Sequence, residues 1–565
     1  MSRRERRFAE LLADDVERER FVGAKEVSGD FMGVCRSGDP WKATQPSGLP
    51  LHMPTVYPIP ERTVKVLRRS RFLSPEERRA FEYLRDTDLY SECTRYKVLL
   101  RKSDVDEADL MLMISSGVFE RASDMVGAGY VFPVYEEIKQ RRRLVHDALT
   151  PNVLCADPPN PFFKTVVEVQ QLLHMGLYAA TIDLKACFYQ FVLKPQVRKY
   201  FSVAILNEVL QPTRLPMGFK WSVVMAQALL KHFVGELGLS MTCCDCYVDN
   251  VLVVGPMAKV RKLAERLCGL FSDAGVTVGD RAEGATVEHR GMSLDFENKT
   301  VALKAAFVEK LRRRVECSRG TWGETRSIIG SVVYACQVLH VPLASLFHVF
   351  KFWARNIRTG TREVREMWEV SKAEMRTALD IIFANAPVPV MRARDEAFDF
   401  IVTDASTSEQ LIAGIYVSGG SIRWFSEKVT CTNDIAVLEM MAVARAVRTW
   451  LERPGSTTHI ISDNVVVLNA MAKGLSANFG VNRIVVSLIP WMERRDAQCH
   501  LWYVASAANP TDPLTRDFVF SALHKQHIER LVRLSTLRMP NWVDEASGQR
   551  KLYPGSLIPI RVWEL

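Results

Sequence analysis

The sequence lacks any long apolar segment. No run approaches the roughly 20 residues that a bilayer-spanning helix needs. The charged opening Met1-Ser-Arg-Arg-Glu-Arg-Arg does not lead into the apolar region of a signal peptide. We therefore expect a protein without a membrane partner that works in the cytoplasm, the nucleus or both.

The 12 cysteines lack the spacing of a metal site. Cys243, Cys244 and Cys246 cluster in a strand-like apolar run, where adjacent side chains point to opposite faces. Reduced core thiols are therefore favoured over a zinc site. Internal repeats and low-complexity tracts are also absent.

What the sequence does have is length and a basic excess. At 565 residues and 48% hydrophobic content, the chain is long enough for several cores, and length alone predicts three or four domains. The formal charge of +9 fits a polyanionic partner. Two short basic runs, at 141–143 and 312–314, either contact phosphates or form a solvated face.

The pattern of elements changes along the chain. Residues 1–104 predict an N-terminal extension with helices, including one that Ser74 caps ahead of Pro75. Residues 105–295 alternate helices and strands as in an α+β sheet domain. Residues 296–395 are mostly helical, and 396–520 begin with three strands before alternating, which predicts an α/β domain. A tail at 521–565 follows, whose apolar residues from 542 onward are candidates to pack on that last domain.

Two acids end predicted strands in the first sheet domain. Asp183 closes one strand, and Asp249 lies in Tyr247-Val248-Asp249-Asn250 between two apolar runs. Taken alone, the second segment is explained as an acidic hairpin turn. A charged carboxylate at the tip of buried strands is nevertheless costly unless a cation meets it. A pair of strand-end carboxylates with phosphate oxygens suits two-metal phosphoryl transfer.

Four segments resemble, in order, the motifs of the reverse transcriptase fingers and palm. They are Arg143-Leu-Val-His-Asp147 with Asn152, Thr181-Ile-Asp183-Leu-Lys-Ala-Cys-Phe188-Tyr-Gln190, Leu215-Pro-Met217-Gly218-Phe-Lys220-Trp-Ser222 and Tyr247-Val-Asp249-Asn250. His289-Arg-Gly291-Met292-Ser is similar to the primer-grip hairpin that precedes a helical thumb. The resemblance implies a right-hand polymerase of fingers, palm and thumb.

The resemblance also implies roles for individual residues. Asp183 and Asp249 would bind two Mg²⁺ or Mn²⁺ ions, and the backbone of Leu184 would help to hold the triphosphate. Arg143 would clamp triphosphate oxygens. Phe188 would exclude a 2′-hydroxyl, although from the residue alone a core aromatic is the favoured explanation. The remaining substrate contacts would come from the template and dNTP motif, at Met217, Gly218 and Lys220, where glycine would let the backbone pass close to the nascent base pair.

Two positions depart from the family pattern. Asn250 replaces the second acid of the usual pair, so a neutral amide oxygen stands in place of an anionic ligand. We expect weaker metal binding and altered catalysis. Met217 stands where glutamine is common, which removes a hydrogen-bonding group near the sugar and template.

The last domain carries four acids in an ordered pattern. Asp404, Glu439, Asp463 and Asp512 fall on a strand, a helix, a strand and a helix start. This distribution resembles RNase H, whose four carboxylates gather two metal ions around an RNA phosphate. Glu439 alone would read as a solvated glutamate on an amphipathic helix. The histidine that often precedes the last acid is missing, and His500 is expected at the start of a strand.

The last motif of the domain resembles RNase H domains of particular groups of genetic elements. Val504-Ala-Ser-Ala-Ala-Asn509-Pro-Thr-Asp512-Pro-Leu-Thr515-Arg516 is similar to RNase H domains of gypsy-like and DIRS-like retrotransposons and of hepadnaviral polymerases. An aspartic protease signature and the zinc-binding pattern of an integrase are missing from the sequence. The combination favours the DIRS-like group, in which a recombinase carries out insertion.

The sequence thus predicts an RNA-directed DNA polymerase with a linked RNase H. The implied partners are an RNA template, a DNA primer, the RNA/DNA hybrid and dNTPs, with a retroelement structural protein and a recombinase as further partners. Each active site would hold two metal ions. The rival hypothesis is a nucleic-acid-binding scaffold that keeps both folds with a weakened or inactive polymerase site, and Asn250 is its main support.

Overall fold

The computed structural model describes residues 49, 51–94, 103, 105–122, 124–136, 140–161, 163–394, 399–419, 421–451 and 453–516, and the backbone of 560–562. The expectations for residues 1–48 and for most of the tail lie outside these ranges. The chain forms two compact units, Met1–Lys164 with Leu172–Asn298, and Thr165–Gln171 with Lys299–Leu565. Within the described ranges, no helix is long and apolar enough to cross a membrane.

The N-terminal part of the first unit is helical where it is described. Ser74 accepts a hydrogen bond from the amide of Glu77, and the Glu77 side chain accepts one from the amide of Ser74. This capping box satisfies amides of the first turn, which confirms the predicted helix start. The elements are α4 (Glu61–Leu67), α5 (Pro75–Ala80), η1 (Phe81–Leu84) and η2 (Thr87–Thr94).

A six-stranded mixed sheet makes up the fingers-like part of the first unit. Its order is β1 (Leu51–His52), β4 (Arg141–Asp147), β3 (Ala128–Glu136), β6 (Ser202–Ile205), β7 (Glu208–Pro212) and β2 (Phe119–Arg121). Val131, Leu144 and Leu210 are fully buried on it. Arg142 on β4 donates two hydrogen bonds to Asp109 in α6 (Glu107–Ser115), which fastens that helix to the sheet. Further short helices are α7 (Leu149–Leu154), η5 (Cys187–Gln190), α9 (Pro195–Arg198) and η6 (Lys199–Phe201).

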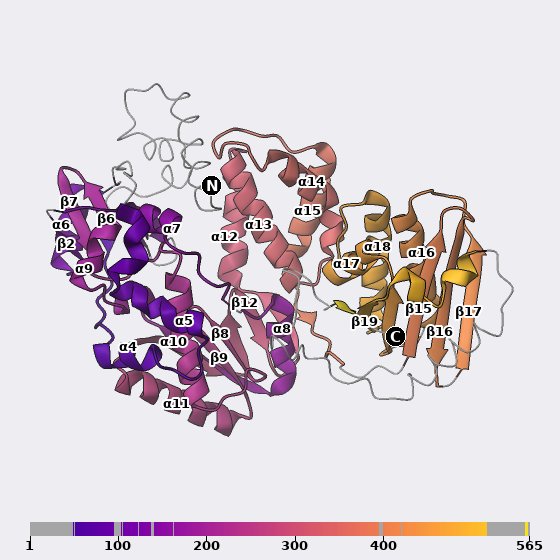
Figure 1. Ribbon diagram of the computed structural model, residues 1–565, viewed down its shortest axis with the longest axis horizontal. Helices are drawn as coiled ribbons and strands as arrows, with labels where there is room; N and C mark the ends of the chain where they lie inside the picture. The colour runs from indigo at the N-terminus through magenta and orange to yellow at the C-terminus, as the bar shows by residue number, and fades with distance from the viewer. Residues whose placement is uncertain are drawn as a thin grey trace. The chain divides into compact units, whose positions relative to one another are not determined.

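A four-stranded antiparallel sheet makes up the palm-like part. Its order is β10 (Val278–Gly284), β5 (Tyr178–Leu184), β9 (Asn250–Gly255) and β8 (Cys244–Tyr247). The apolar side chains of β5 and β9 are buried with those of α10 (Ser222–Glu236) and α11 (Met257–Asp273) in one core. Both helices lie beside the sheet (Figure 1). Cys244 and Cys246 are buried free thiols in this core, as the sequence predicts.

A hairpin follows the palm-like sheet. It joins β11 (Thr286–His289) to β12 (Met292–Asp295), and His289 pairs with Met292 across it. Arg290 and Gly291 in the turn have φ values of +50° and +80°, a combination that a two-residue hairpin turn requires. The hairpin expected from the sequence is therefore confirmed.

The second unit contains the predicted helical segment. The helices are α8 (Val166–Gln171), α12 (Ala305–Glu316), α13 (Trp322–Val338), η7 (Leu343–Leu346), α14 (Phe347–Asn356) and α15 (Glu369–Ala384). Trp322 is fully buried and meets Phe352 edge-on, with ring centroids 5.9 Å apart. The short strands β13 (Thr300–Leu303) and β14 (Val388–Pro389) pair beside these helices. η4 (Leu172–Met175) belongs to the first unit.

The rest of the second unit is a mixed sheet in the order β17 (Ser421–Lys428), β16 (Leu411–Ser418), β15 (Asp399–Ser406), β18 (Thr457–Ser462), β19 (Gln498–Tyr503) and β20 (Ile560–Val562). β15 to β17 are antiparallel neighbours, whereas β18 is parallel to β15 and β19 is parallel to β18. The helices are α16 (Ile435–Trp450), α17 (Val465–Lys473) and α18 (Phe479–Arg494), followed by η8 (Ser506–Ala508) and η9 (Asp512–Thr515) (Figure 1).

The α+β fold class, with an RNase H-like α/β domain after the polymerase-like part, is confirmed. The tail contributes one strand, because β20 pairs in parallel with β19. This pairing confirms that part of the tail packs on the last domain.

Candidate active sites

The backbone of the palm-like sheet brings Asp183 and the Asp249 turn to the same edge. Asp183 pairs with Asn250 in the antiparallel β5–β9 register. Directly opposed residues of an antiparallel pair project from the same face of a sheet. The amide of Leu184 donates to the carbonyl oxygen of Asp249 at 2.8 Å, which ties the turn to β5. Asp183, Asp249 and Asn250 therefore gather at one strand end, as the sequence predicts.

The charges of Asp183 and Asp249 both affect the pKa of the Cys187 thiol. Burial raises the pKa of Cys187 well above its usual value, and Asp249 and then Asp183 raise it further. Both acids therefore act on one buried group. Burial also raises the pKa of Asp249, whereas the positive charge of Arg143 lowers it. Arg143 thus lies close enough for its charge to act on Asp249.

The amide of Asn250 fits a cation at this edge. Its Oδ1 is buried and has no hydrogen-bond partner in the described part of the chain. A buried oxygen without a donor is costly, and a hard divalent cation accepts carboxylate and amide oxygens as ligands. Two carboxylates with this amide oxygen suit Mg²⁺ or Mn²⁺.

Gln227 and Gly279, which the sequence analysis does not single out, support this geometry. Val248 has φ of +57°, which is unusual for a β-branched residue. Gln227 on α10 holds it there, since its Oε1 accepts from the Val248 amide at 2.9 Å and its Nε2 donates to Cys246 O at 2.8 Å. A Cβ at Gly279 on β10 would lie 3.0 Å from Oδ2 of Asp183, so glycine leaves room for that carboxylate. Neither position has a local sequence signal.

Three residues predicted to contact substrate, Leu184, Phe188 and Met217, are bonded or packed within the chain. The amide of Leu184 already donates to Asp249 O, so the structure leaves no free N–H there for a triphosphate. Phe188 is 9% exposed and belongs to the hydrophobic core, which agrees with the core-aromatic alternative. Met217 packs partly buried against the same core.

Gly218 and Lys220 are held by the fingers-like part of the same unit. A Cβ at Gly218 would lie 2.4 Å from the carbonyl oxygen of His146, so the chain itself requires glycine there. The need for glycine thus comes from the packing of the chain against His146 and not from the close approach to a base pair that the sequence suggests. Lys220 Nζ donates to Cys155 O at 2.7 Å and lies 3.0 Å from Asp157 Oδ1. Asn152 joins the two by donating to Gly218 O and accepting from the Lys220 amide.

The two basic runs are largely engaged within the chain. Arg142 is bonded to Asp109, and Arg141 and Arg143 both reach Glu136. In the other run, Arg313 pairs with Glu309, while Arg312 lies over the ring of Phe383. Of the first run, Arg143 keeps 42% of its side chain exposed, and it is the arginine that acts on Asp249.

A buried polar cluster holds the hairpin after the palm-like sheet. His289 Nε2 lies 2.8 Å from Asp245 Oδ2, with both side chains essentially inaccessible. Arg290 lies 3.6 Å from the same oxygen, stacks 4.2 Å from the ring centroid of Tyr247 and donates to Lys164 O. The hairpin turn is thereby fixed to the strand that leads into the Asp249 turn.

In the second unit, three of the four predicted acids converge. Asp404 on β15, Glu439 on α16 and Asp463 after β18 each place one oxygen within 4.8 Å of the others. Asp512 at the start of η9 lies near enough to raise the pKa of Asp404. It also forms an ion pair with Arg516 at 2.8 Å. Three of the four acids predicted from the sequence thus surround one small volume, and the charge of Asp512 acts on that cluster.

The electrostatics of this cluster favour a cation. Burial, followed by the charges of Asp404 and Asp463, raises the pKa of Glu439 to about 9. Burial also raises the pKa of Asp404 to about 6, opposed by a hydrogen bond from Thr515 and reinforced by Asp463 and Asp512. Glu439 is 3% exposed, so the solvated-glutamate alternative is wrong, and its Oε2 has no hydrogen-bond partner in the described part of the chain. The donors are all carboxylates, which suits Mg²⁺ or Mn²⁺.

The closing motif supplies the supports of the cluster. The hydroxyl of Thr515 lies 2.7 Å from Oδ2 of Asp404 and 2.7 Å from the carbonyl oxygen of Asp512. Asn509 donates to Thr403 O at 3.0 Å and lies 3.4 Å from Oδ1 of Asp463. Both side chains are buried. His500 lies within β19, which confirms it as a strand residue.

The chain matches no family model. It is similar to the solved structure of the foamy viral protease-reverse transcriptase in complex with an RNA/DNA hybrid, with 16% identity over 85% of this chain and 66% of that chain and a TM-score of 0.46. It is also similar to that foamy viral protein in complex with double-stranded DNA, with 16% identity over 81% of this chain and 99% of that chain and a TM-score of 0.44. The fold is argued from this chain's own strand order and register.

Proposed function

We propose that this protein is an RNA-directed DNA polymerase with a linked RNase H. The observation that carries the proposal is the presence of two separate carboxylate sites, one on each kind of sheet. In one, Asp183 and Asp249 meet at a β5–β9 strand end. In the other, oxygens of Asp404, Glu439 and Asp463 lie within 4.8 Å of one another. The order of the motifs along the chain supports the same pairing of activities.

In the polymerase site the chain's own residues would bind and orient. Asp183, Asp249 and the amide oxygen of Asn250 would hold the ions. Arg143, whose charge already acts on Asp249, would take triphosphate oxygens. Bound Mg²⁺ or Mn²⁺ would supply charge stabilisation and an activated primer hydroxyl. The Arg290 hairpin, fixed by Asp245 and His289, would hold the primer end beside the turn.

In the RNase H site the crowding of acids sets the chemistry. Glu439, with its pKa raised to about 9, would keep a proton at neutral pH until a cation compensates the cluster. Asp404 and Asp463 would then be shared ligands, and Thr515 would orient the Asp404 carboxylate. Bound ions would supply an activated water for attack on the RNA phosphate. The hybrid would be recognised by groove shape and 2′-hydroxyls.

The partners and the setting follow from these activities. We infer an RNA template, a DNA primer, dNTPs and the RNA/DNA hybrid as direct partners. The closing motif supports membership of a DIRS-like retrotransposon, with a retroelement structural protein and a recombinase acting beside this chain. A cytoplasmic or nuclear location suits copying of that RNA.

The test is incorporation of dNTPs on a primed RNA by the purified chain with Mg²⁺ or Mn²⁺. We expect metal-dependent extension, followed by metal-dependent shortening of the copied RNA. Normal binding of primed RNA without any extension would overturn the polymerase half.

The scaffold remains as a second candidate because of Asn250. With one carboxylate fewer, the first site would bind ions more weakly than a site with the usual acid pair. In that case hybrid cleavage would be present in the wild-type chain and lost in Asp463→Asn, while extension would be absent. The two candidates are thus separated by one pair of assays.

A further inference from the structure

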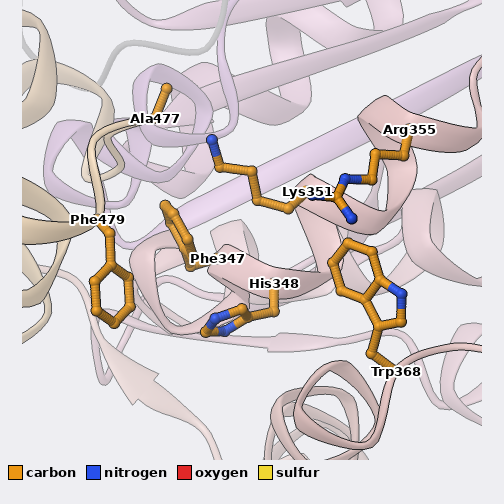
Figure 2. A pocket seen from close by; sticks show the side chains of 7 residues that line it. All are labelled: Phe347, His348, Lys351, Arg355, Trp368, Ala477 and Phe479. Atoms are coloured by element: carbon orange, nitrogen blue, oxygen red, sulfur yellow. The ribbon is translucent and has the colours of Figure 1, made fainter.

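A pocket in the second unit gathers aromatic and cationic side chains outside both carboxylate sites. Its volume is about 440 Å³. The lining residues come from α14, from the residue before α15, from the segment between α17 and α18 and from the first residue of α18. They include Phe347, His348, Lys351, Arg355, Trp368 and Phe479 (Figure 2). Nothing in the two proposed reactions uses these side chains.

The pocket presents positive charge. Lys351 and Arg355 lie four residues apart on α14 and are exposed. Neither forms an ion pair with any residue that the structure describes, and each head group lies near a ring. The neighbouring acid Glu374 is engaged, because its Oε2 accepts from the amides of His348 and Val349 and its Oε1 lies 2.7 Å from His348 Nδ1. The pocket therefore offers two cations that no carboxylate of the described residues pairs with.

The pocket also presents an open aromatic ring. Phe479 is 51% exposed, although its centroid lies only 5.3 Å from that of Phe347 and 5.8 Å from that of His348. The ring of Trp368, by contrast, is covered by the guanidinium of Arg355, which lies 4.8 Å from the ring centroid. Figure 2 shows Phe479 and Phe347 at one end of the pocket, and Arg355 with Trp368 at the other. An exposed ring beside free cations suits a planar group that carries negative charge.

We propose that this pocket binds an unpaired nucleotide of a nucleic-acid strand. The base stacks on Phe479, and the adjoining phosphates contact Lys351 and Arg355. Paired bases are already stacked within a duplex, so the ring selects a single-stranded stretch. Basic side chains with an exposed aromatic are the combination found where proteins bind single strands without reading their sequence.

The position of the pocket relates it to the RNase H site, and this part rests on the proposed function. α17 begins two residues after Asp463 and has nine residues, and the segment that follows it leads into Phe479. A helix of that length spans about 14 Å. The length of this helix matches roughly four nucleotide steps of a strand. A strand that leaves a hybrid at the carboxylates is therefore the source we infer for the unpaired nucleotide.

The experiment measures binding in EDTA, so it needs neither metal nor turnover. Two fluorescent RNA/DNA hybrids are compared, one blunt and one with a single-stranded extension of roughly eight nucleotides, a usual site size for such grooves. The variants are Phe479→Ala and the double change Lys351→Ala with Arg355→Ala. Trp424→Ala is a matched aromatic control, because Trp424 is 52% exposed on β17. Arg376→Ala on α15 is the matched charge control, because Arg376 is also exposed.

We expect the wild-type chain to prefer the extended hybrid. Phe479→Ala weakens binding of the extended hybrid by roughly tenfold and leaves the blunt hybrid within twofold. The double variant lowers the slope of log affinity against log salt by about 1.4, as two lost phosphate contacts require on a single strand. Both controls behave as wild type. A 4-thiouridine in the extension crosslinks to the peptide that contains Phe479 in the unaltered chain, which provides a readout that needs no variant.

Several results would overturn the proposal. Equal losses on the blunt and the extended hybrid would indicate a duplex contact, and no loss with no crosslink would indicate that the pocket is only packing. If wild-type protein neither extends primers nor cleaves hybrid yet still prefers the extended hybrid, the proposed function fails and the pocket stands. If both reactions occur without that preference, the pocket fails and the proposed function stands.

Discussion

The two carboxylate sites differ in how the chain builds them. The palm-like site uses one strand and the tip of one hairpin, and it places an amide, Asn250, where a third oxygen donor is needed. The RNase H-like site draws its acids from two strand ends and two helices, and it buries Glu439 almost completely. The first site thus limits its negative charge, whereas the second accumulates it.

This difference determines what each site needs from a cation. At the palm-like site, Arg143 already offsets part of the charge on Asp249. At the RNase H-like site, the pKa of Glu439 rises to about 9, so the metal-free cluster keeps a proton at neutral pH. We therefore expect the second site to bind ions more tightly and to gain more stability from them.

The largest expected effect separates the two sites by activity. Asp183→Asn removes a carboxylate that Asn250 cannot replace, so dNTP incorporation should fall by roughly a thousandfold, about 4 kcal/mol in the barrier. Hybrid cleavage should be unchanged. Primer-extension and cleavage assays on one preparation measure both. Asp280→Asn, an exposed acid on β10, serves as the control. Equal loss of both activities would break the comparison.

The second prediction concerns the stability of the metal-free chain. The folded-state pKa of Glu439 is about 9 against 4.5 for the free group, so the folded chain keeps a proton that the unfolded chain releases. The free energy of unfolding should therefore fall as pH rises from about 4.5 to about 9, by up to about 1.4 kcal/mol per pH unit from this group. Asp404 adds to the same trend between 3.8 and about 6.

Thermal melting in EDTA across this pH range measures the effect. Glu439→Gln should melt at a higher temperature than wild type at pH 8 and show a flatter pH dependence. Mg²⁺ should raise the wild-type melting temperature at pH 8, because binding to the folded state stabilises it. Glu409→Gln, at an exposed position of the same domain, should behave as wild type. Parallel curves for wild type and Glu439→Gln would contradict the burial of charge.

A smaller effect is expected when the charge of the first site is restored. Asn250→Asp adds an anionic ligand, so the Mg²⁺ concentration for half-maximal extension should drop by roughly three- to tenfold, since ligand charge tunes affinity for hard cations. Magnesium titrations of the extension rate measure this. The half-maximal concentration for hybrid cleavage serves as the internal control. An unchanged or higher requirement for extension would argue that Asn250 is not a ligand.

The smallest expected effect concerns the hydrogen bond from Thr515 to Asp404 in the RNase H-like site. Thr515 donates to Asp404 and lowers the pKa of that acid. Thr515→Val should therefore shift the acid limb of the cleavage pH profile upward and slow cleavage at pH 7 by roughly two- to fivefold, which corresponds to about 0.5–1 kcal/mol, the net contribution of an ordinary hydrogen bond. Thr515→Ser should retain the wild-type profile. A uniform loss at all pH values in both variants would point to a packing defect instead.

The sequence predicted the acids of both sites because strand ends and motif order are local patterns. Asp183, Asp249, Asp404, Glu439 and Asp463 all lie where those patterns indicate. The Ser74 helix start was predicted from its capping residues, and the β11–β12 hairpin from the resemblance of His289-Arg-Gly291-Met292-Ser to a family motif.

Other features depend on tertiary contacts that no local pattern encodes. Gln227 holds the Val248 turn from 21 residues away, and Gly279 leaves space for Asp183 from another strand. The resemblance implies that the backbone of Leu184 helps to hold a triphosphate, whereas the folded chain uses its amide to donate to the carbonyl oxygen of Asp249. The pocket at Phe479 forms where segments more than 100 residues apart in the sequence meet, so no local sequence pattern predicts it.

The most direct test of two independent sites is a crossed pair of variants, Asp249→Asn and Asp463→Asn, each assayed for metal-dependent primer extension and hybrid cleavage. We predict that Asp249→Asn loses extension and keeps cleavage, and that Asp463→Asn loses cleavage and keeps extension. Loss of both activities in either variant, or survival of both, would contradict the account.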